Sequence, residues 1–271
     1  MNRNLRPKTV VSIAILFLCG ILTGCAANEE PLSRTGFYFD TVIQITLYDS
    51  SDETVLDGCF ALAEKYENML SATKENSDVF KINHSGGAPV EVTADTAELL
   101  ETALYYAELT GGKIDPTILP VAELWNFGSD KTPAVPDPSS LEEALSHVDY
   151  HTIHVVTTGD SCTVTLRDPQ AMIDLGFIAK GYIADRMKAY LLSEGISSAC
   201  INLGGNVVTI GDKPDGSPFR IGVQEPFATE GTPITVVSLS DASLVSSGVY
   251  ERYFYQDDIL YHHILDPATG Y

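Results

Sequence analysis

Hydrophobic and polar positions alternate along one stretch of the chain and follow a helical period in the next. Within residues 41–48, Ile43, Ile45 and Leu47 share one face, which predicts a strand with a strongly apolar side. Within residues 53–70 the apolar positions recur at steps of three and four, which predicts an amphipathic helix. A strand followed directly by a helix therefore opens the globular part of the chain.

The remaining pattern divides the chain into a helical first half and a strand-rich second half. Residues 71–87 and the proline-containing residues 129–140 are interpreted as loops, and Ser139 or Ser140 is expected to cap a short helix that runs to about His147. Because strands mostly follow strands in the second half, we expect one α+β domain in which mixed or antiparallel sheets have flanking helices. Further helices are predicted at residues 94–111 and 178–192, and strands at residues 153–157, 163–167, 171–175, 200–203, 207–210, 219–224, 234–239, 251–256 and 260–265.

Composition narrows the class of protein. The 271 residues are 44% hydrophobic and 20% charged, which is typical of a globular protein and excludes wholesale disorder or a multi-span membrane protein. Asp and Glu total 37 against 16 Lys and Arg, so the net charge is −21. Such a surface repels phosphate backbones, so nucleic-acid binding is not expected, and an anionic cofactor would need a local cationic pocket or a metal.

The N-terminal segment resembles a bacterial lipoprotein signal. A basic start is followed by an apolar run, residues 10–22, and then by Leu-Thr-Gly with Cys25 directly after it. The resemblance implies that residues 1–24 are cleaved as a signal peptide, that Cys25 is lipidated, and that residues 25–35 form a tether. The protein is then expected in the cell envelope, lipid-anchored to the outer face of the cytoplasmic membrane or to the periplasmic side. An ordinary signal peptide with an incidental cysteine is the alternative.

Four short motifs contain the residues that could carry chemistry. In the first, residues 110–117 (TGGKIDPT), Asp115 precedes a proline and is held extended, and two glycines allow close approach of the backbone to a ligand. The second, residues 174–181 (DLGFIAKG), places Asp174 at a strand end and Lys180 at the start of a helix, where free N–H groups favour an anion. Alone, the first also fits a turn before a core aromatic residue, and the second an N-cap with a solvated lysine.

The other two motifs lie at strand ends. Residues 202–206 (NLGGN) contain a glycine pair that permits positive φ or close approach of a ligand. In residues 261–270 (YHHILDPATG), the adjacent His262 and His263 point to opposite faces of a strand, so they cannot easily bind one metal ion. Asp266 and the proline after it begin a turn. Each motif alone also fits a plain turn or a hairpin end.

The four motifs in this order are far more specific than any one of them. From about Gly36 to its last residue the chain resembles the ApbE-type FAD:protein FMN transferases. The resemblance implies an enzyme that cleaves the FAD pyrophosphate with a divalent metal, usually Mg²⁺. It would transfer FMN to a Thr or Ser hydroxyl of an acceptor flavoprotein and release AMP. Two alternatives stay open: an FAD pyrophosphatase that gives FMN and AMP, and a lipid-anchored flavin-binding protein without catalysis.

The resemblance also implies roles for individual residues. His263 is the candidate base for the acceptor hydroxyl, because an imidazole titrates near pH ~6.5. Phe177 occupies the position whose backbone carbonyl binds the metal. Thr73 stands where many members carry Tyr, which leaves the balance between transfer and hydrolysis open. The positions expected to bind FAD are Phe39, Thr73, Lys113, Ile114, Asp115, Asp174, Lys180, Asn202, Gly204, Gly205 and Leu265.

The end of the sequence carries one more expectation. Family members continue past the His-Ile-Leu-Asp-Pro turn into a segment similar to Ala-Asp-Ala-Leu-Ser-Thr, whose Asp and Thr side chains supply the remaining metal ligands. The sequence stops at Tyr271, so the transferase domain, residues 36–271, is expected to lack its C-terminal part. We therefore expect the chain as given to bind Mg²⁺ weakly and to show little FMN transfer.

Overall fold

The structure is a computed structural model that describes residues 30–128 and 131–271. The chain divides into two units, residues 1–31 and Leu32–Tyr271. The expected signal peptide and the lipidation site Cys25 lie outside the described residues, so the following concerns the second unit. Within the described ranges, no helix is both long enough and apolar enough to cross a membrane.

The largest sheet has five antiparallel strands in the order β1-β2-β6-β7-β10. The alternation expected for β2 is present, because Ile43, Ile45 and Leu47 are fully buried whereas Val42 and Gln44 are exposed. The sheet therefore has one core face and one outer face. Its strands are β1 (Leu32–Tyr38), β2 (Thr41–Leu47), β6 (Ala199–Leu203), β7 (Asn206–Ile210) and β10 (Ser243–Val245).

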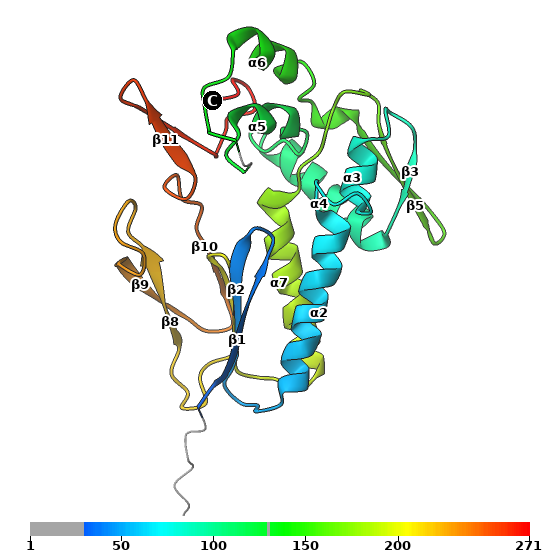
Figure 1. Cartoon of the computed structure of the whole chain (residues 1–271). Coiled ribbons are helices and arrows are strands. Elements are labelled where there is room, and N and C mark those ends of the chain that lie inside the picture. Colours follow the sequence, from blue (N-terminus) through cyan, green and yellow to red (C-terminus); the bar gives the residue numbers. More distant parts are fainter. Residues whose placement is uncertain (1–29, 129–130) are drawn as a thin grey trace, which may run out of the picture. The chain divides into compact units, whose positions relative to one another are not determined.

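Two long helices, α2 (Glu53–Leu70) and α7 (Gly176–Ser193), lie side by side next to this sheet (Figure 1). Asp52 begins α2 by accepting a hydrogen bond from the N–H of Thr54. Apolar side chains of both helices, among them Leu56 and Met187, are buried in one cluster with the core face of the sheet. The predicted helices and the α+β class are confirmed.

A three-stranded antiparallel sheet, β3-β5-β4, and two hairpins, β8-β9 and β11-β12, complete the strands. The remaining elements are α3 (Asp78–Asn83), β3 (Val90–Val92), α4 (Ala94–Leu109), α5 (Leu119–Trp125), α6 (Pro138–Leu145), the 3₁₀ turn η1 (Tyr150–Thr152), β4 (Ile153–Thr158), β5 (Ser161–Leu166), β8 (Phe219–Gln224), β9 (Pro233–Leu239), β11 (Tyr253–Gln256) and β12 (Ile259–His262).

A second, smaller hydrophobic cluster forms around Trp125 at the end of α5. Trp125 is 1% exposed, and Leu141 of α6 is buried beside it. Phe254 of β11 and Tyr261 of β12 pack on this cluster, with ring centroids 6.3 and 5.4 Å from that of Trp125. The Trp125 cluster therefore joins two helices of the first half to the last hairpin.

The structure differs from the expectations where elements are short. Residues 71–87 contain α3, which begins at Ser77, whose hydroxyl accepts from the N–H of Phe80. The strand β1 begins at Leu32, inside the stretch expected as a tether. Neither element was predicted, because the sequence of β1, LSRTGFY, does not alternate apolar and polar positions, and the six residues of α3 make fewer than two helical turns.

Two further expectations are wrong. Asp137 caps α6, because its carboxylate accepts from the N–H groups of both Ser139 and Ser140, which had been expected to cap the helix. Residues 171–175 form no strand, and only Met172 makes a single bridge, to Ile118. The pattern of these residues instead reflects burial of Ile173 and its neighbours in the main core.

Candidate functional site

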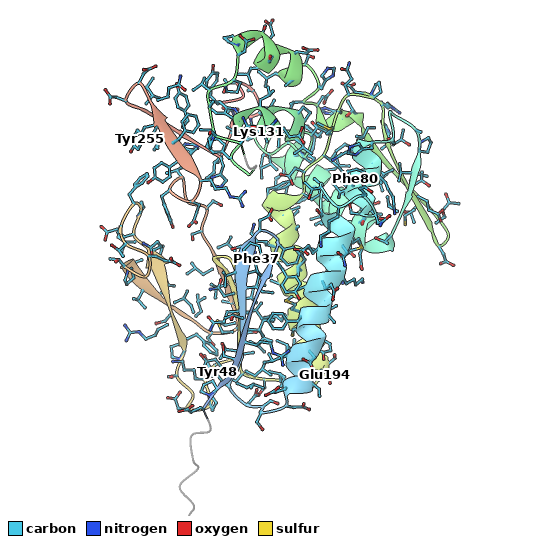
Figure 2. All side chains as sticks on the ribbon, viewed as in Figure 1. Phe37, Tyr48, Phe80, Lys131, Glu194 and Tyr255 are labelled. Carbon is cyan, nitrogen blue, oxygen red and sulfur yellow. The ribbon has the colours of Figure 1, made fainter. Side chains whose placement is uncertain are left out.

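Two tight turns lie next to each other at one end of the large sheet, here called the turn end. Phe39 and Asp40 connect β1 to β2, and Gly204 and Gly205 connect β6 to β7. All four residues have positive φ, the geometry preferred in two-residue hairpin loops. A Cβ on Gly204 would come within 2.3 Å of the Thr41 hydroxyl, so the two turns are in contact. In Figure 2, Phe37 lies toward this end of the sheet, whereas Tyr48 lies at the other.

Phe39 adopts a left-handed conformation that bulky residues rarely occupy, with φ 55°. Its N–H donates a hydrogen bond to Oε1 of Glu67 near the end of α2 (2.9 Å). The other oxygen of Glu67 forms an ion pair with Lys74, in the loop that carries the exposed Thr73. Glu67 therefore connects the strained turn to the loop after α2. The two predicted ligand positions Phe39 and Thr73 lie in the two segments that it connects.

The N-terminal part of α7 lies against the second turn. A Cβ on Gly181 would lie 3.7 Å from the amide nitrogen of Asn206, the first residue after the glycine pair. The side-chain oxygen of Asn202 accepts a hydrogen bond from the N–H of Gly205 (2.9 Å), so it is used within the turn itself. Lys180 directly precedes Gly181, so its partly buried side chain starts from the turn end.

Asp174 stands just before α7 and connects it with the first motif. Its N–H donates to the carbonyl of Pro116 (2.8 Å), and its Oδ1 accepts from the N–H of Gly176 (2.8 Å). The N-cap residue is Leu175, which offers no side-chain acceptor. Asp174 therefore accepts from the N–H of Gly176, and the carbonyl of Leu175 accepts from the N–H groups of Ile178 and Ala179, which leaves the N–H of Phe177 available to a ligand.

The surroundings of Lys180 disfavour its positive charge. Burial lowers the pKa of Lys180, the positive charge of Arg252 lowers it further, and the carboxylate of Asp174 raises it. No carboxylate within the described part of the chain forms an ion pair with Lys180. A partly buried cation without an ion-pair partner is the arrangement that a phosphate group would stabilise.

Asp115 uses both carboxylate oxygens inside the protein. Oδ1 accepts from the N–H (2.8 Å) and the hydroxyl (2.6 Å) of Thr117, and Oδ2 accepts from the N–H of Tyr150 (3.1 Å). The side chain is buried, so these bonds fix the Asp-Pro-Thr turn against η1. Asp115 therefore positions its segment, including Lys113 and the partly buried Ile114, and both of its carboxylate oxygens accept hydrogen bonds within the protein.

An ion pair connects the first motif to the fourth. Lys113 Nζ lies 3.3 Å from Oδ2 of Asp266, and the other Asp266 oxygen accepts from the N–H of Ala268. The indole N–H of Trp125 donates to the carbonyl of Gly270 (2.8 Å), which anchors the same turn. Leu265 is partly buried on the Trp125 cluster. Residues more than a hundred positions apart in the sequence are thus held together.

The two adjacent histidines have different surroundings. His263 has left β12, and both its N–H (3.1 Å) and its ring Nδ1 (3.3 Å) face the carbonyl of Arg252. Nδ1 must donate to a carbonyl oxygen, so in the neutral ring Nε2 carries the free lone pair. Burial lowers the pKa of His263, and the charge of Arg252 lowers it further. His262 pairs with Tyr253 in the hairpin, and its Nδ1 is buried without a hydrogen-bond partner in the described chain.

The predicted metal position lies at the start of α7. Phe177 lies in the first turn of α7, and its side chain is 46% exposed. A phenyl ring has no atom that can coordinate a metal ion, so the residue could offer a metal only its backbone carbonyl. The described residues contain no group of three or more His, Cys, Asp or Glu that could hold a metal ion. A single carbonyl falls short of the near-octahedral oxygen shell that Mg²⁺ requires.

Two residues of the site had been assigned no role from the sequence. Glu67 belongs to a helix whose charged positions all look alike in the sequence, so no signal could have identified it. Arg252 carries a weak signal, because it is a cation directly before the last hairpin of a strongly acidic chain. Glu67 acts on Phe39, 28 positions away, and Arg252 acts on His263, 11 positions away across the last hairpin.

Comparisons with known sequences identify relatives. The family model for the ApbE family matches residues 39–271. An FAD:protein FMN transferase of Treponema pallidum is 35% identical, over 96% of this chain and 76% of its own length. Another, of Klebsiella pneumoniae, is 37% identical over 90% of this chain and 75% of its own length.

Solved structures agree with the sequence relatives. The ApbE protein of Thermotoga maritima superimposes with a TM-score of 0.80 at 34% identity, covering 89% of this chain and 78% of that one. The flavinyl transferase ApbE of Pseudomonas stutzeri, in its apo form, gives a TM-score of 0.77 at 25% identity, covering 92% and 78%. The structural likeness therefore covers about nine-tenths of the chain, and the family model includes all four motifs.

Proposed function

This chain belongs to the ApbE family and is a flavin transferase, and from that premise we propose the reaction and the residues that carry it out. FMN is transferred from FAD to a Thr or Ser hydroxyl of an acceptor flavoprotein, and AMP is released. The observation that carries the assignment of residues is Lys180, a partly buried cation with Arg252 and Asp174 as charged neighbours. Its surroundings suit a phosphate group.

The proposed reaction is a phosphoryl-group transfer in which one P–O bond forms and one breaks. The acceptor hydroxyl oxygen attacks the phosphorus atom of the FMN half, a new P–O bond forms, and the P–O bond to AMP breaks with its electron pair leaving on AMP. His263 Nε2 accepts the hydroxyl proton. Lys180 and the free N–H of Phe177 at the start of α7 bind the phosphate oxygens, on which negative charge is concentrated. Asp115 keeps its segment in place beside them.

A requirement for Mg²⁺ belongs to the proposal on chemical grounds. The two phosphates of FAD are negatively charged, and a divalent cation would offset that charge. The carbonyl of Phe177 and the carboxylate of Asp174 are the described oxygen atoms proposed to face it, which is fewer than Mg²⁺ needs. No step of the reaction above is therefore assigned to the metal.

One assay tests the function against its alternatives. The purified protein is incubated with FAD and an FMN-acceptor domain, with Mg²⁺ or with EDTA, and is analysed for AMP and for a fluorescent acceptor band on a denaturing gel. Transfer gives AMP and the band. Free FMN with AMP but no band would identify a pyrophosphatase, an outcome that Thr73 in place of the usual Tyr keeps open. FAD binding without AMP would identify a flavin-binding protein.

Removing the cation at the turn end is expected to weaken FAD binding. Lys180→Ala deletes a charge-assisted hydrogen bond to phosphate, which corresponds to a loss of about 1.5–3 kcal/mol of binding free energy. Titration of flavin fluorescence measures this loss. Lys188→Ala is the matched control, because Lys188 lies on the same helix but is paired with Asp241. Equal FAD affinity in Lys180→Ala and the wild type would remove Lys180 from the site.

Localisation in the cell envelope is part of the proposal. It rests on the similarity of residues 1–25 to a lipoprotein signal. Cys25→Ser is expected to abolish both labelling with a fatty-acid probe and recovery in the membrane fraction, with Cys59→Ser as the control because Cys59 is a buried free thiol. Unchanged membrane recovery of Cys25→Ser would contradict lipid anchoring.

A further inference from the structure

Arg252 is a cation next to the proposed base, and the reaction described above assigns it no part. Its backbone carbonyl accepts from the N–H (3.1 Å) and faces Nδ1 (3.3 Å) of His263. Its guanidinium extends in the direction of the end of α5, because a Cβ on Gly128 would lie 3.3 Å from Nη1. Arg252 thus contacts the ring of His263 through its main chain, and its guanidinium lies beside Gly128.

No carboxylate in the described ranges neutralises this guanidinium by an ion pair. The lysines and arginines that do form ion pairs there are Arg34, Lys65, Lys74, Lys113, Arg186 and Lys188. In a chain with 37 acidic and 16 basic residues, a carboxylate partner would be easy to supply. Arg252 and Lys180 are therefore both left without a carboxylate in an ion pair, although both lie near the proposed site.

The two cations are also close enough to disfavour each other. The charge of Arg252 lowers the pKa of Lys180 and the pKa of His263. Like charges held near each other in a partly buried site raise the free energy of the unliganded protein. An anion bound between them reverses the sign of this interaction, because each cation then has an attractive partner.

We propose that Arg252 binds, together with Lys180, the phosphate group of the flavin nucleotide that is transferred, while its carbonyl holds His263 in the tautomer that can accept a proton. This inference rests on the proposed function, since the ligand is the phosphoanhydride of FAD. A guanidinium presents two N–H donors in a fixed plane, which matches two oxygens of one phosphate. Negative charge on those oxygens is spread in the transition state, where a fixed planar cation stabilises it.

The two roles of Arg252 can be separated by mutation. The contact with His263 comes from the main chain, so Arg252→Gln retains the carbonyl and removes only the guanidinium. Arg252→Lys keeps a positive charge and loses the planar pair of donors. Arg220→Gln is the control, because Arg220 is an exposed arginine of β8.

The experiment compares three flavins that differ only in their phosphates. Binding of FAD, FMN and riboflavin is measured by fluorescence titration for the wild type and each variant. Arg252→Gln is expected to bind FAD and FMN about tenfold to a hundredfold more weakly, and riboflavin as the wild type does, because riboflavin carries no phosphate. Arg252→Lys should fall between the two, and Arg220→Gln should equal the wild type.

A second readout concerns His263. Without the neighbouring positive charge, the acid limb of the pH–rate profile of FMN transfer should move to higher pH in Arg252→Gln. The other charged neighbours of the ring, His262 and Glu251, are unchanged in this variant. Such a shift distinguishes loss of a nearby charge from a general loss of structure.

Three results would overturn the inference. FAD and FMN affinities equal to those of the wild type would exclude a phosphate contact. An equal loss for riboflavin would show that the substitution disturbs the fold. An acid limb at the same pH as in the wild type would show that the guanidinium does not affect the pKa of His263. By contrast, failure of the wild type itself to bind FAD would contradict the proposed function, so the two failures are distinguishable.

Discussion

Replacement of His263 by alanine is expected to slow FMN transfer about 10²–10⁴-fold and to leave FAD affinity nearly unchanged. The variant loses Nε2, the only nitrogen of this ring that is free to accept the hydroxyl proton, because Nδ1 faces the carbonyl of Arg252. Lys180 and Arg252, the proposed phosphate ligands, are unchanged in this variant. Single-turnover rates of transfer, measured beside a fluorescence titration with FAD, separate the two quantities.

The pH dependence gives this prediction a second test. Burial lowers the pKa of His263 below the value of about 6.5 for a free imidazole. The ring therefore stays neutral, and able to accept a proton, as the pH falls through about 6.5, and transfer should decline only at lower pH. The residual activity of His263→Ala should lack this acid limb.

His262→Ala is the matched control for the adjacent ring. His262 pairs with Tyr253 inside the hairpin, and the structure gives it no link to Arg252. We expect it to transfer FMN within a few-fold of the wild type. A large loss in His262→Ala together with full activity of His263→Ala would show that the two histidines have been assigned to the wrong faces.

The Trp125→Ala substitution is expected to have the largest effect on stability. Trp125 is 1% exposed and packs against Phe127, Phe254 and Tyr261. Truncating such a side chain costs about 3–5 kcal/mol, because contacts are lost and a cavity remains. The indole N–H also holds the carbonyl of Gly270, so the turn that carries Asp266 should loosen with the cluster. Urea unfolding followed by far-ultraviolet circular dichroism measures the loss.

Trp125→Phe separates packing from the hydrogen bond. The phenyl ring retains most of the contacts and lacks the N–H, so the expected loss is about 1–3 kcal/mol, the usual cost of a buried acceptor left unpaired. Circular dichroism is needed because the chain contains 1 Trp, and both variants remove that fluorophore. A loss below about 1 kcal/mol in Trp125→Ala would show that the cluster does not support the fold.

Long elements with a strong period were predicted correctly, and so were most of the short strands of the second half, whereas α3, α5 and β1 were missed. The helix at residues 53–70 matches α2 in both bounds, because many turns repeat the same spacing. The seven residues of α5 include a proline and make too few turns to show a period. The cap of α6 depends on one aspartate oxygen that accepts two N–H groups, and a run of Asp, Pro and Ser does not single that residue out.

The same limit applies to the site. The order of the four motifs indicated the family, and the family is confirmed. The sequence could not show that the carboxylate of Asp115 is occupied by Thr117 and by Tyr150, because the Tyr150 contact spans 35 positions. It also could not show that Arg252 supplies the carbonyl facing His263. Roles that depend on a partner far along the chain become visible only when the fold brings the partners together.

The left-handed turn at Phe39 and Asp40 has a consequence for the engineering of this protein. A left-handed conformation costs a residue with a side chain about 1–2 kcal/mol relative to a right-handed one, and both positions have φ 55°. A selection for heat resistance alone would therefore enrich glycine at both. Glycine at position 39 would also remove the aromatic ring that is expected to contact the flavin. Selection for thermal tolerance and selection for turnover should thus favour different sequences in this turn. A phenylalanine at position 39 is what selection for turnover would retain.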